Sequence, residues 1–149
     1  MKHVVRLFGV CAVFLSAGFA WADDLPVIDV HKNPNCGCCA AWELHLREAG
    51  FTVRGHETQD IAATRARFGM PESMASCHTA KVGDYLIEGH VPGEDIKRLL
   101  AEQPPALGLA VPGMPAGSPG METGEAASYD TLLVGKDGAS RIFQHHTTR

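Results

Sequence analysis

Short apolar runs and helical repeats alternate along the first two thirds of the chain. Residues 26–31 form a β-rich run, and the turn residues 33–35 end it. Apolar side chains then recur at helical spacing over residues 38–49, before a glycine that predicts the end of a helix. Residues 51–56 alternate as a second strand, and residues 58–68 follow as a second helix.

The next part of the pattern gives the buried side of the second helix and predicts a hairpin and a third helix. Ile61 and Phe68 are expected at the buried positions of the second helix. Residues 79–82 and 85–88 flank a Gly-Asp pair, which is typical of a tight hairpin. Pro92 begins the third helix, whose apolar stripe comprises Ile96, Leu99 and Leu100.

The order β-α-β-α-β-β-α over residues 23–103 predicts an α/β fold of thioredoxin-like type, with parallel pairing and an antiparallel edge. Residues 104–128 are rich in Pro and Gly, cannot hold a helix and offer little apolar surface to bury. Residues 129–134 and 141–143 predict a terminal β-hairpin. We therefore expect residues 104–149 to form a C-terminal Pro/Gly/Met-rich extension that packs on the same domain.

The first residues have the pattern of a secretory signal peptide. A short basic region precedes an apolar run over residues 7–19, and Ala20-Trp21-Ala22 supplies a small-x-small cleavage site. The run is shorter than the roughly 20 apolar residues that a transmembrane helix needs. We expect removal of residues 1–22, with Ala20 as the alternative cleavage point, and loss of Cys11 with the leader. The mature protein is then periplasmic, with no membrane segment.

Charge and export narrow the classes of function. The chain has 13 Lys and Arg residues against 17 Asp and Glu residues, and its formal net charge is −4. The leader holds basic but no acidic residues, so its removal makes the chain more acidic. An acidic exported domain is a poor candidate for nucleic-acid binding. Export also places thiols in an oxidising compartment, where a metal or a dedicated reductant must protect them.

Four cysteines remain after removal of the leader, and three of them lie within four positions. Cys36 and Cys39 form a Cys-x-x-Cys pair at the predicted strand-to-helix turn, where a helix N-terminus lowers a thiol pKa from about 8.5 to roughly 3.5–7.5. Such thiolates are redox nucleophiles or metal ligands. Cys38 adds a third sulfur that a dithiol enzyme does not need. Cys77 adds a fourth, from a loop that lies beside the redox turn in a thioredoxin-like fold.

Four thiolates favour a soft metal ion. Thiolates select Cu(I) over hard cations, and zinc also accepts four sulfurs. The side chains of the neighbouring Cys38 and Cys39 diverge, which fits bridging sulfurs in a multinuclear copper cluster better than a single ion. Plainer roles stay open for Cys77 as a small buried hydrophobe, and for His78 and His90 as hydrogen-bonding residues.

The extension adds methionine and histidine candidates for metal ligands. Met114 and Met121 lie in a segment with few large apolar side chains, so thioether coordination of a soft metal is the interpretation we favour. His145 and His146 are further candidates, although a histidine pair near a terminus is more often a plain surface feature.

The motifs that contain these residues resemble those of the CopG-type family, which is found among bacterial copper-resistance genes. The matching motifs are Lys32-x-Pro34-x-Cys36-Gly37-Cys38-Cys39-x-x-Trp42, Ser76-Cys77-His78-Thr79-Ala80, Ile87-Glu88-Gly89-His90-Val91-Pro92, and the stretch from Gly108 to Glu122. The resemblance implies a periplasmic thioredoxin-like domain with a C-terminal extension. It also implies a cysteine-bridged copper cluster at the Cys-x-Cys-Cys turn and an oxidoreductase role in copper detoxification.

Three hypotheses of function follow. The first is a monomeric copper-resistance protein that binds Cu(I) in a multinuclear cluster, with or without interconversion of Cu(I) and Cu(II) as a copper oxidoreductase. The second is a thiol–disulfide oxidoreductase in which Cys36 and Cys39 exchange with partner thiols. The third is passive copper storage, or delivery to a periplasmic efflux or chaperone partner.

Overall fold

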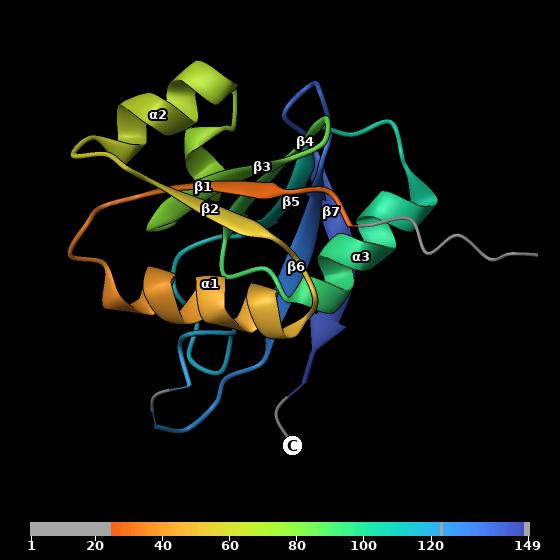
Figure 1. The fold of residues 1–149 in the computed structure, drawn as a ribbon. Helices are drawn as coiled ribbons and strands as arrows, with labels where there is room; N and C mark the ends of the chain where they lie inside the picture. Colours follow the sequence, from red (N-terminus) through yellow and green to blue (C-terminus); the bar gives the residue numbers. More distant parts are fainter. Residues whose placement is uncertain (1–24, 123, 148–149) are drawn as a thin grey trace, which may run out of the picture.

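The computed structural model describes residues 25–122 and 124–147, so the predicted leader at residues 1–22 lies outside the described part (Figure 1). The elements are β1 (Ile28–Lys32), α1 (Gly37–Glu48), β2 (Val53–Glu57), α2 (Ile61–Phe68), the 3-10 helix η1 (Glu72–Met74), β3 (His78–Val82), β4 (Tyr85–Gly89), α3 (Gly93–Glu102), β5 (Gly108–Val111), β6 (Tyr129–Val134) and β7 (Ser140–His146). The predicted order of strands and helices is confirmed as far as α3, and so is the terminal hairpin.

The seven strands form one mixed sheet in the order β2-β1-β3-β4-β5-β6-β7. β1 pairs in parallel with β2, with Ile28 opposite Val53, and α1 makes the crossover between them. β3 and β4 form the predicted antiparallel hairpin, and β6 and β7 form the second one. The described residues therefore form a mixed α/β fold with three α-helices around a seven-stranded sheet.

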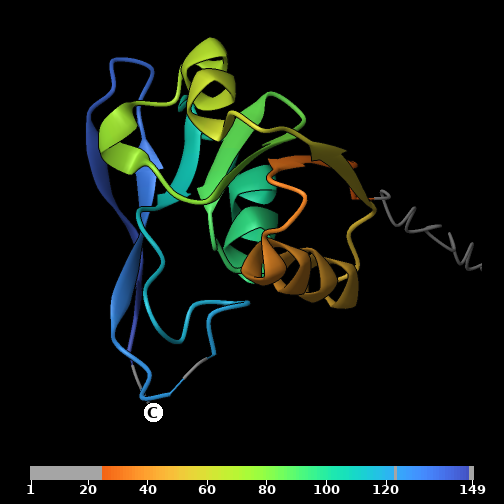
Figure 2. The same cartoon turned by 90° about the vertical axis from the view of Figure 1, so that its left-hand side faces the viewer.

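Helices cover both faces of the sheet. α1 and α3 lie on one face and α2 lies on the other (Figures 1 and 2). Trp42 and Leu46 of α1 and Ile96 of α3 are fully buried against the strands, in the larger of two apolar clusters. Met70 and Met74 belong to the smaller cluster. The chain that leaves β4 lies against α1, where Trp42 Nε1 donates to the carbonyl of Val91 at 2.8 Å.

The buried positions expected for α2 were wrong. Ile61 and Phe68 are only partly buried, whereas Thr64 and Arg65 are buried. Arg65 turns inward because its guanidinium pairs with the buried carboxylate of Glu88, at 2.8 Å. An internal ion pair thus replaces the apolar contact that periodicity predicted.

A strand that the sequence pattern did not predict lies in the middle of the sheet. β5 pairs in parallel with β4 and antiparallel with β6, and all four of its residues are buried. Its run is short and unbroken by polar residues, and prolines flank it on both sides, so it shows neither alternation nor helical spacing. From β5 the chain continues as a segment, residues 112–128, that passes beneath the start of α1 before β6 begins (Figure 2).

Across the described residues, none of the helices has both the length and the apolar character needed to cross a bilayer.

Candidate metal centre

The turn between β1 and α1 presents three cysteines at the N-terminus of a helix. The amide of Cys36 donates to the carbonyl of Asn33 at 3.0 Å, and α1 begins one residue later at Gly37. Cys36 and Cys39 are joined by a disulfide, with Cα atoms 5.3 Å apart. In the described part of the chain the free cysteines are Cys38 and Cys77.

Cys77 reaches this turn from the loop between η1 and β3. Its Sγ lies 3.5 Å from Cys39 Sγ and 3.9 Å from Cys38 Sγ. Cys38 Sγ in turn lies 3.5 Å from Cys36 Sγ. The four sulfurs all lie within 4.8 Å of one another, which is close enough for shared metal ligation once the disulfide is open.

Two buried histidines also lie next to Cys77. His78 Nδ1 lies 3.4 Å from Cys77 Sγ, and His90 Nε2 lies 3.1 Å from it. Both rings are fully buried, and the His78 ring packs against Trp42 at an angle of 34°, with ring centroids 4.2 Å apart. Cys77, His78 and His90 form a second group whose ligand atoms lie within 4.8 Å of one another, and we call it the histidine donor set.

Burial keeps the two imidazoles neutral. It lowers the pKa of His78 to about 3 and lowers that of His90 as well. The Nδ1 of His90 donates to the carbonyl of Pro119 at 2.7 Å, so its Nε2 carries the lone pair and points at Cys77. His78 Nε2 is buried and has no hydrogen-bond partner among the described residues.

Without a cation nearby, the Cys77 thiol holds its proton. Burial and the neighbouring Cys38 raise its pKa to about 12, whereas the helix N-terminus alone predicted lowered thiol pKa values in this site. A metal ion reverses this balance, because a coordinating thiol is deprotonated outright. Cys77 is therefore suited to a metal ligand that releases its proton on binding.

A buried ion pair holds the loop that carries Cys77. Arg65 donates to the carboxylate of Glu88 at 2.8 Å and to the carbonyl of Ser76 at 2.6 Å. The same Glu88 oxygen accepts from the amide of Ser76 at 2.9 Å. The backbone amide and carbonyl of Ser76 are thus both hydrogen-bonded to this ion pair, one residue before Cys77.

The segment 112–128 closes the site from the side of α1. Besides the Pro119 carbonyl that holds His90, Gly120 lies so close to α1 that a Cβ there would be 2.7 Å from the carbonyl oxygen of Cys38. At the other end of the segment, the Ser76 hydroxyl donates to the carbonyl of Gly113 at 2.5 Å. The extension therefore borders the cysteine turn directly.

The two predicted methionine ligands lie on the segment between β5 and β6. Met114 is 53% exposed, and Met121 is partly buried in the turn where its carbonyl accepts from the amide of Gly117. His145 is hydrogen-bonded to the carboxylate of Asp130 at 2.6 Å.

His146 bonds to the carboxylate of Asp95 at 2.9 Å and to the hydroxyl of Thr131 at 3.0 Å. The two terminal histidines thus each have a carboxylate partner on β6 or α3, and neither belongs to the groups of converging ligand atoms found among the described residues.

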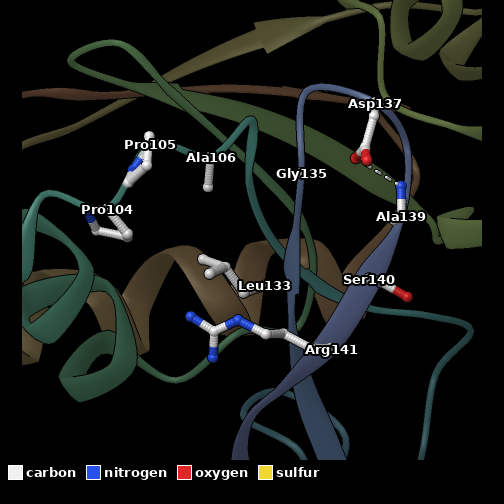
Figure 3. A pocket seen from close by; sticks show the side chains of 9 residues that line it. All are labelled: Pro104, Pro105, Ala106, Leu133, Gly135, Asp137, Ala139, Ser140 and Arg141. Atoms are coloured by element: carbon white, nitrogen blue, oxygen red, sulfur yellow. Dashed lines mark hydrogen bonds between the residues drawn. The ribbon is translucent and has the colours of Figure 1, made fainter.

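An open pocket of about 340 Å³ lies elsewhere, between the chain after α3 and the β6–β7 hairpin (Figure 3). Its lining is largely apolar, includes the charged side chains of Arg141 and Asp137, and contains neither cysteine nor histidine. The side chains that Figure 3 labels therefore do not contribute to the cysteine site.

Fold and site together define a mixed α/β protein with a cysteine-rich candidate metal centre. A family model described as "Protein of unknown function, DUF411" matches residues 74–121. Two solved structures of the copper resistance protein CopG are each 42% identical to this chain. Form 2 aligns over 82% of this chain and 98% of its own with a TM-score of 0.78, and form 1 over 83% and 98% with a TM-score of 0.77. The chain belongs to the CopG-type family of copper-resistance proteins. No curated protein matches it.

Proposed function

We propose that the chain is a periplasmic copper-binding protein that protects against copper by holding Cu(I) in a multinuclear cluster bridged by Cys36, Cys38, Cys39 and Cys77. In this proposal a monomeric thioredoxin-like domain carries the site, and the extension closes it. Copper ions are the cargo, and an efflux or chaperone protein is the receiving partner. The family relationship supports the link to copper, because the matched proteins are named for copper resistance.

The position of Cys77 carries the proposal. A loop 38 residues away in the chain places its Sγ 3.5 Å from Cys39 Sγ and 3.9 Å from Cys38 Sγ. Thiolates and neutral imidazoles are soft or borderline ligands, and they select Cu(I) over hard cations. His78 Nδ1 and His90 Nε2 lie 3.4 Å and 3.1 Å from Cys77 Sγ, so two buried imidazole nitrogens stand beside the sulfurs. Loading requires the reduced chain, since the disulfide occupies two of the four sulfurs.

A copper count tests this function. The reduced chain is titrated with Cu(I) anaerobically against a Cu(I)-specific chelator, and bound copper per chain is measured for the parent and for Cys77→Ser. We expect more than one copper in the parent and a sharp loss in the variant. Ser73→Ala changes an exposed residue of η1 in the same loop and serves as the matched control. One copper per chain, or none, would reject the cluster.

The disulfide supports a second candidate function, thiol–disulfide exchange by Cys36 and Cys39. The two cysteines form a Cys-x-x-Cys bridge at a helix N-terminus, which is the arrangement of dithiol oxidoreductases. Cys38→Ser separates the two functions: an oxidoreductase keeps its exchange rate with a dithiol substrate, whereas a four-sulfur cluster loses copper. Storage or delivery without redox chemistry predicts copper binding without any change in thiol count.

A further inference from the structure

The disulfide and the proposed copper cluster draw on the same sulfur atoms. The Cα atoms of Cys36 and Cys39 lie 5.3 Å apart, inside the range of about 4.4–6.8 Å that a relaxed disulfide needs. The turn therefore accommodates the bridge as it stands. The site has two chemical states: an open state with four thiols, and a closed state in which Cys38 and Cys77 are the free thiols among the described cysteines.

Cys36 and Cys39, which we call the redox pair, have a free thiol against each sulfur. Cys38 Sγ lies 3.5 Å from Cys36 Sγ, and Cys77 Sγ lies 3.5 Å from Cys39 Sγ. A metal ion bound by Cys77 is thus separated from the redox pair by a single sulfur–sulfur contact. No protein segment has to move aside for electrons to pass between them.

The histidine donor set does not depend on the state of the redox pair. Its three members, Cys77, His78 and His90, take no part in the disulfide, and their ligand atoms converge in the closed state. One thiolate with two neutral imidazoles suits Cu(II) as well as Cu(I), because imidazole is a good ligand for both copper ions. This set can therefore receive Cu(II) while the redox pair is reduced.

From these contacts we propose that the redox pair is the electron donor that reduces Cu(II) bound at the histidine donor set. Two Cu(II) ions, bound at this set one after the other, each gain one electron and become Cu(I). The two thiols of the redox pair lose two electrons and two protons, one sulfur–sulfur bond forms, and both protons go to solvent. A dithiol reductant, which becomes a disulfide itself, reopens the pair. The inference rests on the copper-binding function proposed above and adds the source of the electrons.

Closing the bridge also lowers the number of copper ions that the site can hold. Two of the four sulfurs leave the ligand set when Cys36 and Cys39 join, so a cluster that they bridge loses those ligands. Formation of the disulfide therefore couples the reduction of Cu(II) to the release of copper. The product is Cu(I), which a partner with soft ligands can take up.

The test mixes the fully reduced chain with two equivalents of Cu(II) without oxygen. Cu(I) is measured with a Cu(I)-specific dye, remaining thiols are alkylated and counted, and new disulfides are mapped by mass spectrometry. We expect two Cu(I) formed and two thiols lost per chain, with the bridge between Cys36 and Cys39. The variants Cys36→Ser and Cys39→Ser keep the histidine donor set. They should no longer form two Cu(I) for two thiols lost per chain. His56→Ala, an exposed histidine on β2, is the matched control.

Different results would overturn the electron donation inferred here and the copper-binding function proposed above. Copper that stays divalent, a bridge that forms between Cys38 and Cys77 instead, or unchanged Cu(I) formation in Cys36→Ser overturns electron donation by the redox pair. Equal Cu(I) capacity in the disulfide-closed and reduced chains overturns the coupled release. In either case the copper-binding function stands if the reduced chain still takes up several Cu(I) ions. Failure of that direct titration rejects the function itself.

Discussion

His78 directs Nδ1 at Cys77 Sγ, 3.4 Å away, and leaves Nε2 on the other side of its ring. Its imidazole is fully buried and lies on Trp42, and Nε2 has no partner among the described residues. A buried polar group without a hydrogen bond costs about 1–3 kcal/mol. A phenyl ring keeps the contact with Trp42 and removes the unpartnered nitrogen. We therefore predict that His78→Phe raises the free energy of unfolding of the metal-free chain by about 1 kcal/mol and lowers its copper content.

Urea unfolding of the metal-free protein and Cu(I) titration measure the two effects. His90→Phe is the matched comparison, because His90 donates to the Pro119 carbonyl and its replacement leaves that oxygen without a partner. This variant should lose stability by about 1–3 kcal/mol. A similar loss in His78→Phe would mean that the ring has a structural role instead.

The sequence predicted the cysteines of the site better than its histidines. Three thiols within four positions have no ordinary structural explanation, and the element order alone placed Cys77 beside them. His78 and His90 stayed undecided, because a histidine next to a cysteine or at a strand end also satisfies backbone groups. Only the packing distinguishes the two cases, since it buries both rings and directs one nitrogen of each at Cys77.

The elements around the site are held together by the buried pair of Arg65 and Glu88. It connects α2 to β4 and fixes Ser76 between them, and both side chains are at most 3% exposed. Removing one partner leaves a buried charge unpaired, which costs about 3–5 kcal/mol. We predict such a loss for Arg65→Met, and recovery of most of it in the double variant Arg65→Met/Glu88→Met.

Urea unfolding measures this stability, and the Cu(I) titration adds a second readout. The double variant removes both side chains that bond the backbone of Ser76, so its copper content should stay below that of the parent even though its stability recovers. Full copper binding in the double variant would show that the ion pair does not position the Cys77 loop.

The segment between β5 and β6 contacts the site through Gly120. Its φ is +85°, and an added Cβ would lie 2.7 Å from the Cys38 carbonyl oxygen and 2.9 Å from the Trp42 amide nitrogen. We predict that Gly120→Ala displaces this segment, frees His90 from Pro119 and lowers copper affinity at least ten-fold. Copper titration measures the affinity, and circular dichroism checks that the sheet is intact.

Gly113→Ala is the control for Gly120→Ala, because it distinguishes the effect of backbone strain from that of a steric clash with α1. Gly113 has a φ of +70°, but nothing lies within 4 Å of its added Cβ. Its substitution therefore carries the strain of a left-handed backbone, on the order of 1–3 kcal/mol, without the clash against α1. Equal copper affinity in the two alanine variants would contradict a role for the contact between Gly120 and α1.

The features that the sequence did not predict are those that tertiary packing determines. β5 is a four-residue central strand between two proline-rich stretches, so no periodicity could reveal it. Arg65 lies at a buried position of α2 only because β4 supplies a carboxylate opposite it. Strands and helices with clear alternation or helical spacing, such as β1 and α1, were predicted within a residue or two of their observed ends.

In the whole molecule, one sheet contains strands from both parts of the chain, residues 23–103 and the predicted extension of residues 104–149. β5 lies between β4 and β6, and β6 and β7 extend the sheet to its edge. Leu109, Val111 and Leu133 belong to the same apolar cluster as Trp42 of α1. Residues 104–149 therefore supply part of the main core as well as a border of the cysteine site.

This shared core predicts that a chain ending at Gln103 does not fold by itself. The truncation would remove the buried side chains of Leu109, Val111, Leu133 and Val134 and expose β4 along its whole length. Burial of one such side chain contributes about 1.5–3 kcal/mol, so their sum is comparable to the total stability of about 5–15 kcal/mol that most domains have. We expect residues 23–103 to show no cooperative urea transition, whereas residues 23–149 show one. A cooperative transition in the shorter chain would mean that α1, α3 and the first four strands form a sufficient core, and that the extension serves the copper site alone.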